Sequence, residues 1–244
     1  ESGGALTYAI IGSGQGGGRM AKAFFDLGYR KTIAFNLAKS DLNHLGLPEN
    51  HKHHLVYEGA SGAGKNHAVS KQAFDDKSQE VFNKLREVFG EKIDRILICV
   101  GVGGGTGGGS VMSLLDTAKR YFTYIGVENP NERIGVIASL PTSGECASPI
   151  VAENSYNRMT ELCKEAEKGK FAPLIIIDND KIKKLYSKLT VKQFWPTLNN
   201  TVAGLFHIFN LLCTKNSDYT VFDPADYDSI MKTAGCMIFG ATTI

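Results

Sequence analysis

Short apolar runs alternate along this chain with longer segments in which apolar residues recur every three or four positions. The apolar runs predict strands at 6–11, 31–36, 95–100, 134–140, 173–177 and 236–239. The helical spacing predicts helices at 19–27, 69–89, 151–168 and 198–214, and two more that begin near 111 and 224. Because the strands are apolar throughout and alternate with helices, the pattern predicts an α/β fold: a Rossmann-like, mostly parallel sheet with helices on both faces.

Many of the 27 glycines lie in three short runs, at 12–18, 59–66 and 101–110. Each run is expected at the carboxyl end of a strand, where parallel sheets bind their ligands. Glycine lets backbone N–H groups approach a ligand without a Cβ in the way, and successive N–H groups form hollows that bind anions. Three such loops at neighbouring strand ends predict a site that surrounds a phosphate chain, and therefore a nucleotide.

Two familiar nucleotide motifs are incomplete in these runs. The first run has the glycine spacing of a dinucleotide site, but Asn36 stands where such a site holds the ribose with an acid, and Asp41 comes several residues later. The second run is one residue short of a P-loop, and Asn66 replaces the hydroxyl residue that binds Mg²⁺. An NAD-dependent Rossmann oxidoreductase is therefore kept as an alternative, and a P-loop enzyme is disfavoured.

Composition and charge narrow the function classes further. The 244 residues are 43% hydrophobic and 21% charged, a balance typical of a globular chain that buries a core. A net charge of +2 predicts no direct binding to nucleic acid or membranes. Five cysteines without a C-x-x-C pair predict free, buried thiols in a cytoplasmic protein. No metal-ligating residues are predicted, since solvated side chains are expected at His44, His51, His53 and His54.

Residues 103–109 read GGGTGGG and resemble the GGGTGxG signature of the tubulin/FtsZ superfamily, and similar loops recur along nearly the whole chain. The resemblance implies a GTPase domain that binds GTP or GDP with Mg²⁺. It implies nucleotide contacts from the first two loops at Gly12, Gly14, Gln15, Gly16, Gly17, Arg19 and Asn36. It implies further contacts from the other glycine runs at Gly62, Ala63, Gly64, Lys65, Asn66, Gly103, Gly104, Gly105, Thr106, Gly107 and Gly108.

The resemblance also implies residues for the ribose and the base. Glu145 would accept a ribose hydroxyl, and Asn179 opens an NDK motif after a strand. Asn199 and Asn200 match the positions where the family contacts guanine. Two of these roles have plainer alternatives, because Thr106 and Asn199 could each simply cap a helix.

Residues 221–226 resemble the family loop that reaches into a neighbouring subunit, with Asp223 and Asp226 as its acids. In that reading Asp226 orients the attacking water and Asp223 assists, so each monomer holds half of an active site and the chain assembles head-to-tail with itself into filaments. The same spacing is also a good helix start, with Asp223 as N-cap, and both roles are compatible. A guanine-nucleotide-binding module that does not polymerise is kept as an alternative. An adaptor protein for DNA or phage cargo is a further candidate partner.

Three departures from the bacterial division branch of the family favour a divergent, phage- or plasmid-encoded TubZ-like branch: Pro149, Asn200 and Val221. The resemblance divides the chain into a GTP-binding domain at 1–198, a core helix with the intersubunit loop and following helix at 199–234, and the start of a second, otherwise absent domain at 235–244.

Overall fold

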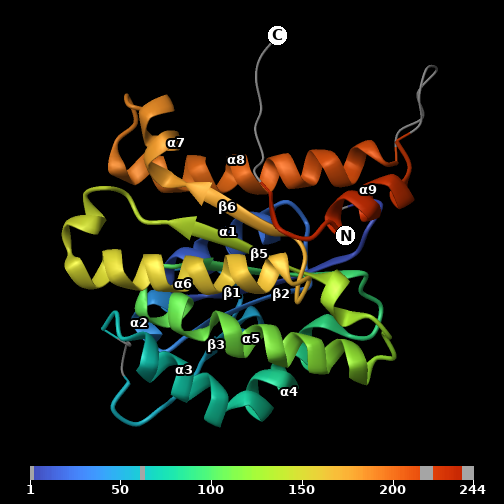
Figure 1. Cartoon of the computed structure of the whole chain (residues 1–244), viewed down its shortest axis with the longest axis horizontal. Coiled ribbons are helices and arrows are strands. Elements are labelled where there is room, and N and C mark those ends of the chain that lie inside the picture. Colours follow the sequence, from blue (N-terminus) through green and yellow to red (C-terminus); the bar gives the residue numbers. More distant parts are fainter. Residues whose placement is uncertain (1–2, 61–63, 215–221, 238–244) are drawn as a thin grey trace.

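A sheet of seven parallel strands runs through the residues that the computed structural model describes, which are 3–60, 64–214 and 222–237 (Figure 1). The order across the sheet is β3-β2-β1-β4-β5-β6-β7, and every neighbouring pair is parallel. The strands are β1 (Tyr8–Ser13), β2 (Thr32–Asn36), β3 (Lys52–His54), β4 (Arg95–Gly101), β5 (Ile134–Leu140), β6 (Leu174–Asp178) and β7 (Cys236–Met237). The predicted parallel α/β sheet is confirmed.

The order of the strands creates a crevice beside β1. The chain runs outward from β1 to β2 and β3, and then returns to place β4 on the other side of β1. The loops that follow β1 and β4 therefore diverge, and such a switch point is where open α/β sheets bind ligands. Ser13 lies opposite Val100 in the register of these two strands, so two of the glycine runs leave the sheet side by side.

Helices cover both faces of the sheet (Figure 1). They are α1 (Gly14–Asp26), α2 (Lys39–Asn43), α3 (His67–Asp76), α4 (Ser78–Phe89), α5 (Gly105–Tyr124), α6 (Pro149–Glu167), α7 (Asn179–Leu185), α8 (Val191–Leu212) and α9 (Pro224–Met231). Alternate strand residues face opposite cores: Ile10 packs with Phe24 of α1 and Phe206 of α8, whereas Ile11 packs with residues of α3 to α6 such as Leu114. Short 3₁₀ turns lie at Glu49–His51, Pro130–Arg133 and Glu145–Ala147.

Several helix boundaries differ from the prediction, and α1 begins at Gly14 rather than at 19. The helix expected at 69–89 is two helices, α3 and α4, because the backbone at Lys77 (φ −100°, ψ 18°) leaves the helical region. The helix expected from 111 begins at Gly105, since glycines add no apolar periodicity from which the first turns could be recognised. α8 begins at Val191 rather than 198, behind a capping box formed by Thr190.

The expected environments of the histidines and cysteines are partly wrong. Three of the histidines are half-buried rather than solvated, because each is hydrogen-bonded: His51 to the Thr32 carbonyl, His53 to Glu80 and His54 to the Leu37 carbonyl. Among the cysteines, Cys99 and Cys213 are buried, Cys146 and Cys163 are half-buried, and Cys236 is exposed. In the described part of the chain, no group of three or more His, Cys, Asp or Glu could hold a metal ion.

The last described strand joins the same sheet. Cys236 and Met237 pair in parallel with Leu174 and Ile175 at the start of β6. The assignment of 235–244 to a second domain stays a prediction, since residues 238–244 lie outside the described residues. Among the described helices, none is both long and apolar enough to cross a bilayer.

Candidate functional site

A cavity of about 380 Å³ opens at the carboxyl ends of the strands. We call it the strand-end cavity. Its walls come from the loops after β1, β2, β3, β4, β5 and β6 and from the first turns of α8. Of the residues expected from the sequence to contact nucleotide, it is lined by Gly14, Gln15, Gly16, Arg19, Asn36, Gly64, Lys65, Gly103, Gly104, Gly105, Thr106, Gly107, Glu145, Asn179 and Asn199. The fold thus brings together residues that are as much as 185 positions apart in the chain, from Gly14 to Asn199 (199 − 14).

Two helix N-termini meet at the floor of this cavity. α1 begins at Gly14, whose positive φ of 75° favours glycine, and α5 begins at Gly105. A Cβ on Gly14 would lie 2.8 Å from the backbone nitrogen of Gly107, so the two turns can be this close only without a side chain there. The first N–H groups of a helix are unpaired within it and carry a partial positive charge. The floor is therefore suited to bind a chain of anionic groups.

Side chains connect the glycine turns to the rest of the sheet edge. The hydroxyl of Thr106 donates to Oδ1 of Asn36 at the end of β2, 3.3 Å away. The hydroxyls of Ser13 and Ser110 are 2.7 Å apart in the interior and join the start of α1 to α5. These contacts fix the two glycine turns relative to each other before any ligand binds.

The opposite wall of the cavity carries polar groups that suit a sugar and a base. Oε2 of Glu145 accepts from the backbone N–H of Thr142, 2.7 Å away, which holds the carboxylate at the rim. The side chain of Asn179 is only 3% exposed, and its Oδ1 is buried without a hydrogen-bond partner among the described residues. A buried amide oxygen left unpaired in a cavity wall is costly unless a ligand donates to it.

Trp195 is a cavity residue that the sequence analysis missed. Its ring lines the strand-end cavity one helical turn before Asn199, and the Arg19 guanidinium lies 6.0 Å from the ring centroid. Trp195 and Asn199 are four residues apart on α8 and so share a helix face. The spacing could have been recognised, but the predicted helix began only at 198, which left Trp195 outside it.

Several expected contact residues lie elsewhere. Gly12, Gly17 and Gly108 are packing positions, where an added Cβ would run into the backbone of Gly17, Cys99 and Val102 respectively. Asn66 caps α3 by accepting from the N–H groups of Ala68 and Val69. Asn200 lines a second, adjoining cavity of about 670 Å³ together with Trp195 and Lys192. Gly62 and Ala63 lie outside the described residues.

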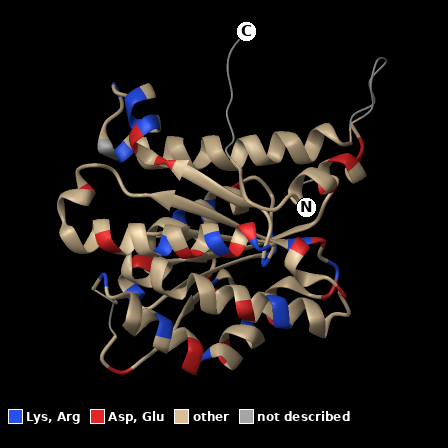
Figure 2. Cartoon of the chain, viewed as in Figure 1, with Lys and Arg blue, Asp and Glu red and all other residues tan. Residues whose placement is uncertain are grey.

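The two aspartates expected to act on a neighbouring subunit lie far from the cavity. α8 has 22 residues and so is about 33 Å long. Trp195 at the cavity lies in its second turn, and Cys213 directly follows its last residue. The charges of Asp223 and Asp226 act on the Cys213 thiol, whose pKa is raised mainly by burial and further by these two carboxylates. Figure 2 shows acidic residues at α9 and the lysines of α7 at opposite ends of α8. In the part of the chain that the structure describes, both aspartates therefore lie away from the cavity of their own copy.

A profile of the tubulin/FtsZ family, GTPase domain, matches residues 7–187, which include β1 to α7 and nearly every loop around the cavity. The chain belongs to the tubulin/FtsZ family. Family membership explains why glycine turns follow both β1 and β4, and it confirms the resemblance carried by residues 103–109.

Relatives within the family include tubulin-like proteins named CetZ and TubZ. The tubulin-like protein CetZ of Pyrococcus abyssi is 26% identical over 230 residues, which cover 93% of this chain and 58% of CetZ. The tubulin-like protein TubZ of Bacillus cereus is 23% identical over 182 residues, which cover 72% of this chain and 39% of TubZ. The chain thus spans about half the length of the relatives that it matches.

Solved structures of family members share the fold. A GTPγS-form protofilament of TubZ from Bacillus thuringiensis serovar israelensis superposes with a TM-score of 0.77 at 22% identity, over 93% of this chain and 62% of TubZ. The GDP-bound monomer of CetZ1 from Haloferax volcanii also gives 0.77 at 22% identity, over 95% of this chain and 66% of CetZ1. Relatives of both the expected TubZ kind and the CetZ kind are therefore similar to this tubulin/FtsZ family member.

One histidine couples two of the family loops. Nε2 of His67, the first residue of α3, donates to the carbonyl of Gly104, 2.9 Å away. Lys65, two residues before His67, lines the cavity and has a positive φ of 67°. Its carbonyl accepts a hydrogen bond from the side chain of Asn154 in α6. Burial, with the nearby charge of Arg158, lowers the pKa of His67 below its usual 6.5. The neutral ring therefore holds the turn before α5 against the start of α3.

Proposed function

We propose that the strand-end cavity binds GTP and GDP, and that a second copy of the chain completes the site for GTP hydrolysis with Asp223 and Asp226. The observation that carries this proposal is the separation of the two halves: the cavity lies at one end of α8 and both aspartates lie beyond its other end. Copies stacked head-to-tail would bring the acidic end of one onto the cavity of the next, and such heterologous contacts form filaments when the rotation does not close.

Nucleotide binding follows from the chemistry of the cavity walls. The unpaired N–H groups at the starts of α1 and α5 would hold the phosphates. Glu145, held at the rim by the Thr142 N–H, would accept a ribose hydroxyl, and the unpaired buried oxygen of Asn179 would accept from a donor on the base or sugar. Trp195 would stack on the base. In this proposal the phosphates would lie near β1 and β4 and the base near α8.

Magnesium fits the same proposal as a companion of the nucleotide. Mg²⁺ takes most of its oxygen ligands from phosphate and water and needs only one or two protein groups. Gln15 and Asp41, whose side chains carry an amide oxygen and a carboxylate, are among the residues that line the cavity and would supply a donor set of that kind. When bound with the nucleotide, the ion neutralises charge on the phosphates.

Hydrolysis would depend on position and charge rather than on a covalent intermediate. Asp226 of one copy would accept a hydrogen bond from the attacking water above the neighbouring γ-phosphate, and Asp223 would assist. Both side chains are exposed, so they are available to a partner. A monomer should be nearly inactive, because its own aspartates are at the wrong end of the molecule.

The test measures the GTP hydrolysis rate against protein concentration, with sedimentation of the same samples. The proposal expects a threshold concentration, rising turnover per molecule above it, and pelleting that needs GTP. Tight guanine-nucleotide binding with no turnover at any concentration would instead identify a binding module that does not polymerise. Binding of NAD in preference to GTP would overturn the proposed substrate. If filaments form, an adaptor protein for DNA or phage cargo is the partner we propose next.

A further inference from the structure

A buried arginine lies at the end of the sheet remote from the cavity. Arg95 is the first residue of β4, and it is 0% exposed. Removing a guanidinium from water is costly unless charged and polar partners replace the water. The identity of those partners shows what the residue holds in place.

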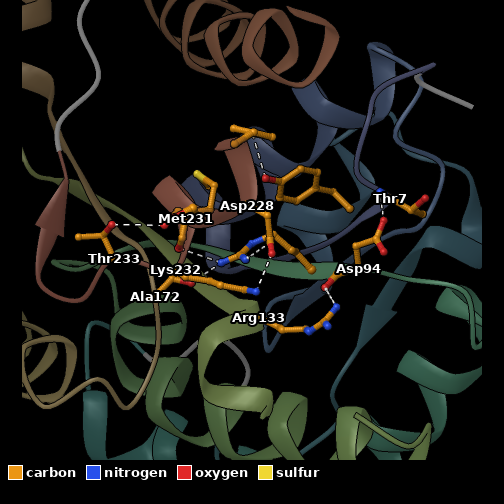
Figure 3. Close-up of polar contacts among 12 residues, drawn as sticks. Thr7, Asp94, Arg133, Ala172, Asp228, Met231, Lys232 and Thr233 are labelled. Carbon is orange, nitrogen blue, oxygen red and sulfur yellow. Dashed lines mark hydrogen bonds and ion pairs between the residues drawn. The ribbon is translucent and has the colours of Figure 1, made fainter. Parts of the chain in front are cut away.

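Every hydrogen bond of the Arg95 guanidinium joins β4 to segments far away in the sequence. Nη1 donates to Oδ1 of Asp228 at 2.9 Å, and Nη2 donates to the carbonyls of Met231 at 2.9 Å and Ala172 at 3.0 Å. Asp228 and Met231 belong to α9, and Ala172 precedes β6. Figure 3 shows Ala172, Asp228 and Met231 gathered around one point, with these contacts drawn as dashed lines.

A second contact docks the same helix. Tyr8, the first residue of β1, lies opposite Arg95 in the strand register, and its hydroxyl is 2.9 Å from that of Tyr227. Tyr227 is 1% exposed and Met231 is fully buried. The first residues of the neighbouring strands β1 and β4 thus contact neighbouring residues of α9. Together these contacts fix both the position and the rotation of this helix.

The other end of α9, its first turn, carries Asp223 and Asp226, and we call it the acidic turn. The helix has only 8 residues, about 12 Å, and helices this short are not stable alone in water. Asp223 is its N-cap and Asp226 lies in its first turn, so their carboxylates move with the helix. Whatever holds α9 on the sheet therefore sets where these two exposed carboxylates point.

We propose that Arg95, acting through Asp228, is a positioning residue for GTP hydrolysis on a neighbouring copy of the chain. This inference rests on the proposed function. Arg95 does not approach the cavity, since it lies at the amino end of β4 and the cavity opens at the carboxyl end. Loss of the Arg95–Asp228 contact should therefore impair the acidic half of the shared site and spare the nucleotide-binding half.

The test uses Asp228→Ala, with Lys232→Ala as a matched control. The Lys232 ammonium also pairs with Asp228, at 2.7 Å, but on the exposed side, so its loss leaves the buried Arg95 contact intact. Asp228→Ala should bind GTP with unchanged affinity and hydrolyse it at least about tenfold more slowly, since positioning errors of about an ångström have effects of this order. Lys232→Ala should stay within about twofold of the unaltered protein. If Asp228→Ala does not fold, Asp228→Asn, which keeps an acceptor for Arg95, should show a smaller loss in the same direction.

Mixing experiments separate positioning from general damage. One partner is the double variant Trp195→Ala/Asn199→Ala, which has a defective cavity and an intact acidic turn. The other partner is Asp226→Ala, which has an intact cavity and a defective acidic turn. A mixture of Asp228→Ala with the cavity-defective partner should regain hydrolysis. In a random equal mixture, roughly a quarter of the contacts between copies bring a good cavity together with a good acidic turn. Asp228→Ala should regain nothing with Asp226→Ala. Recovery with neither partner, recovery with both, or lost GTP affinity would overturn the positioning role.

The same mixtures show when the fault lies in the proposed function instead. Asp226→Ala mixed with the cavity-defective variant contains no change at Arg95 or Asp228. If that mixture fails to regain hydrolysis while the unaltered protein is active, the shared site is wrong, and the positioning role is overturned with it. Recovery in that control, with none for Asp228→Ala, would reject the positioning role alone.

Discussion

Asp223 and Asp226 cap each other at the start of α9. The backbone N–H of Asp226 donates to Oδ1 of Asp223 at 2.9 Å, and the N–H of Asp223 donates to Oδ2 of Asp226 at 3.3 Å. Each carboxylate uses one oxygen in the cap and keeps the other for a partner. Helix capping and action on a neighbouring subunit are therefore compatible, as the spacing in the sequence suggested.

Asparagine separates these two roles, since it caps a helix about as well as aspartate but has no negative charge. We expect Asp226→Asn to leave the thermal midpoint within a few degrees of the unaltered protein and to lower the GTP hydrolysis rate on the order of 100-fold. The control is Asp116→Asn on the exposed face of α5, which should change neither quantity. An Asp226→Asn variant that hydrolyses GTP at the unaltered rate would show that this carboxylate only caps the helix.

Trp195 gives a direct measure of nucleotide binding, since it is the one tryptophan of the chain. Stacking of a base on an aromatic ring contributes about 1–3 kcal/mol, so Trp195→Ala should weaken GTP and GDP binding about tenfold. Trp195→Phe should keep most of the affinity because it keeps a π-face. Binding of either nucleotide should also change the Trp195 fluorescence. Equal affinities for the alanine variant and the unaltered protein would show that the base does not stack on Trp195.

Two neighbouring glycines of the first loop should respond differently to alanine. An added Cβ at Gly17 would fall on the carbonyl oxygen of Cys99, whereas at Gly16 the nearest atom is the Cα of Gly101, 3.8 Å away. Overpacking of this kind costs about 1–3 kcal/mol, so Gly17→Ala should lower the free energy of unfolding by that amount. Gly16→Ala should be neutral or slightly stabilising, because alanine favours the helix in which it lies. Urea unfolding of both variants measures the difference, and equal midpoints would contradict the packing described here.

His67 should make stability depend on pH below neutrality. Burial and the Arg158 charge lower its pKa in the folded protein below the usual 6.5, so the unfolded chain binds the proton more readily. Stability linked to His67 is therefore fully present above pH 6.5 and is lost as the pH falls from there through the lowered folded-state pKa. We expect the free energy of unfolding to fall less between pH 7.5 and 5.5 in His67→Gln, which can still donate to the Gly104 carbonyl. Identical pH profiles for the two proteins would show that His67 does not titrate in this window.

The regular elements with strong apolar patterns were predictable from local sequence. β5 has the predicted boundaries, and β1, β2, β4 and β6 differ by one or two residues, because a buried parallel strand is apolar at every position. β3 was missed, since its three residues, Lys52–His54, are all polar. The start of α5 was not predictable, since Gly105 to Gly109 are poor helix formers, and they are helical here because the whole 20-residue helix packs on the sheet. The pattern of apolar residues therefore gives no helical signal where a helix consists of glycines.

The roles within the glycine runs were only partly predictable. Sequence spacing marked both Gly14 and Gly17, yet Gly14 lines the cavity and Gly17 packs on β4. The difference depends on which way each residue faces after β1 and β4 are paired, and this is a property of the sheet rather than of the loop. Trp195 entered the site in the same way, because α8 crosses the cavity only in the folded chain.

Local sequence determined the kind of chemistry, because glycine spacing is dictated by how closely a backbone must approach its ligand, and that requirement acts within a few residues. Tertiary structure alone decided where the cavity and the two aspartates lie relative to each other. The order of the strands placed the cavity at one end of the molecule, and the length of α8 with the buried contacts of Arg95 placed Asp223 and Asp226 at the other. Those distances arise from packing between segments more than a hundred residues apart, and no local pattern encodes them.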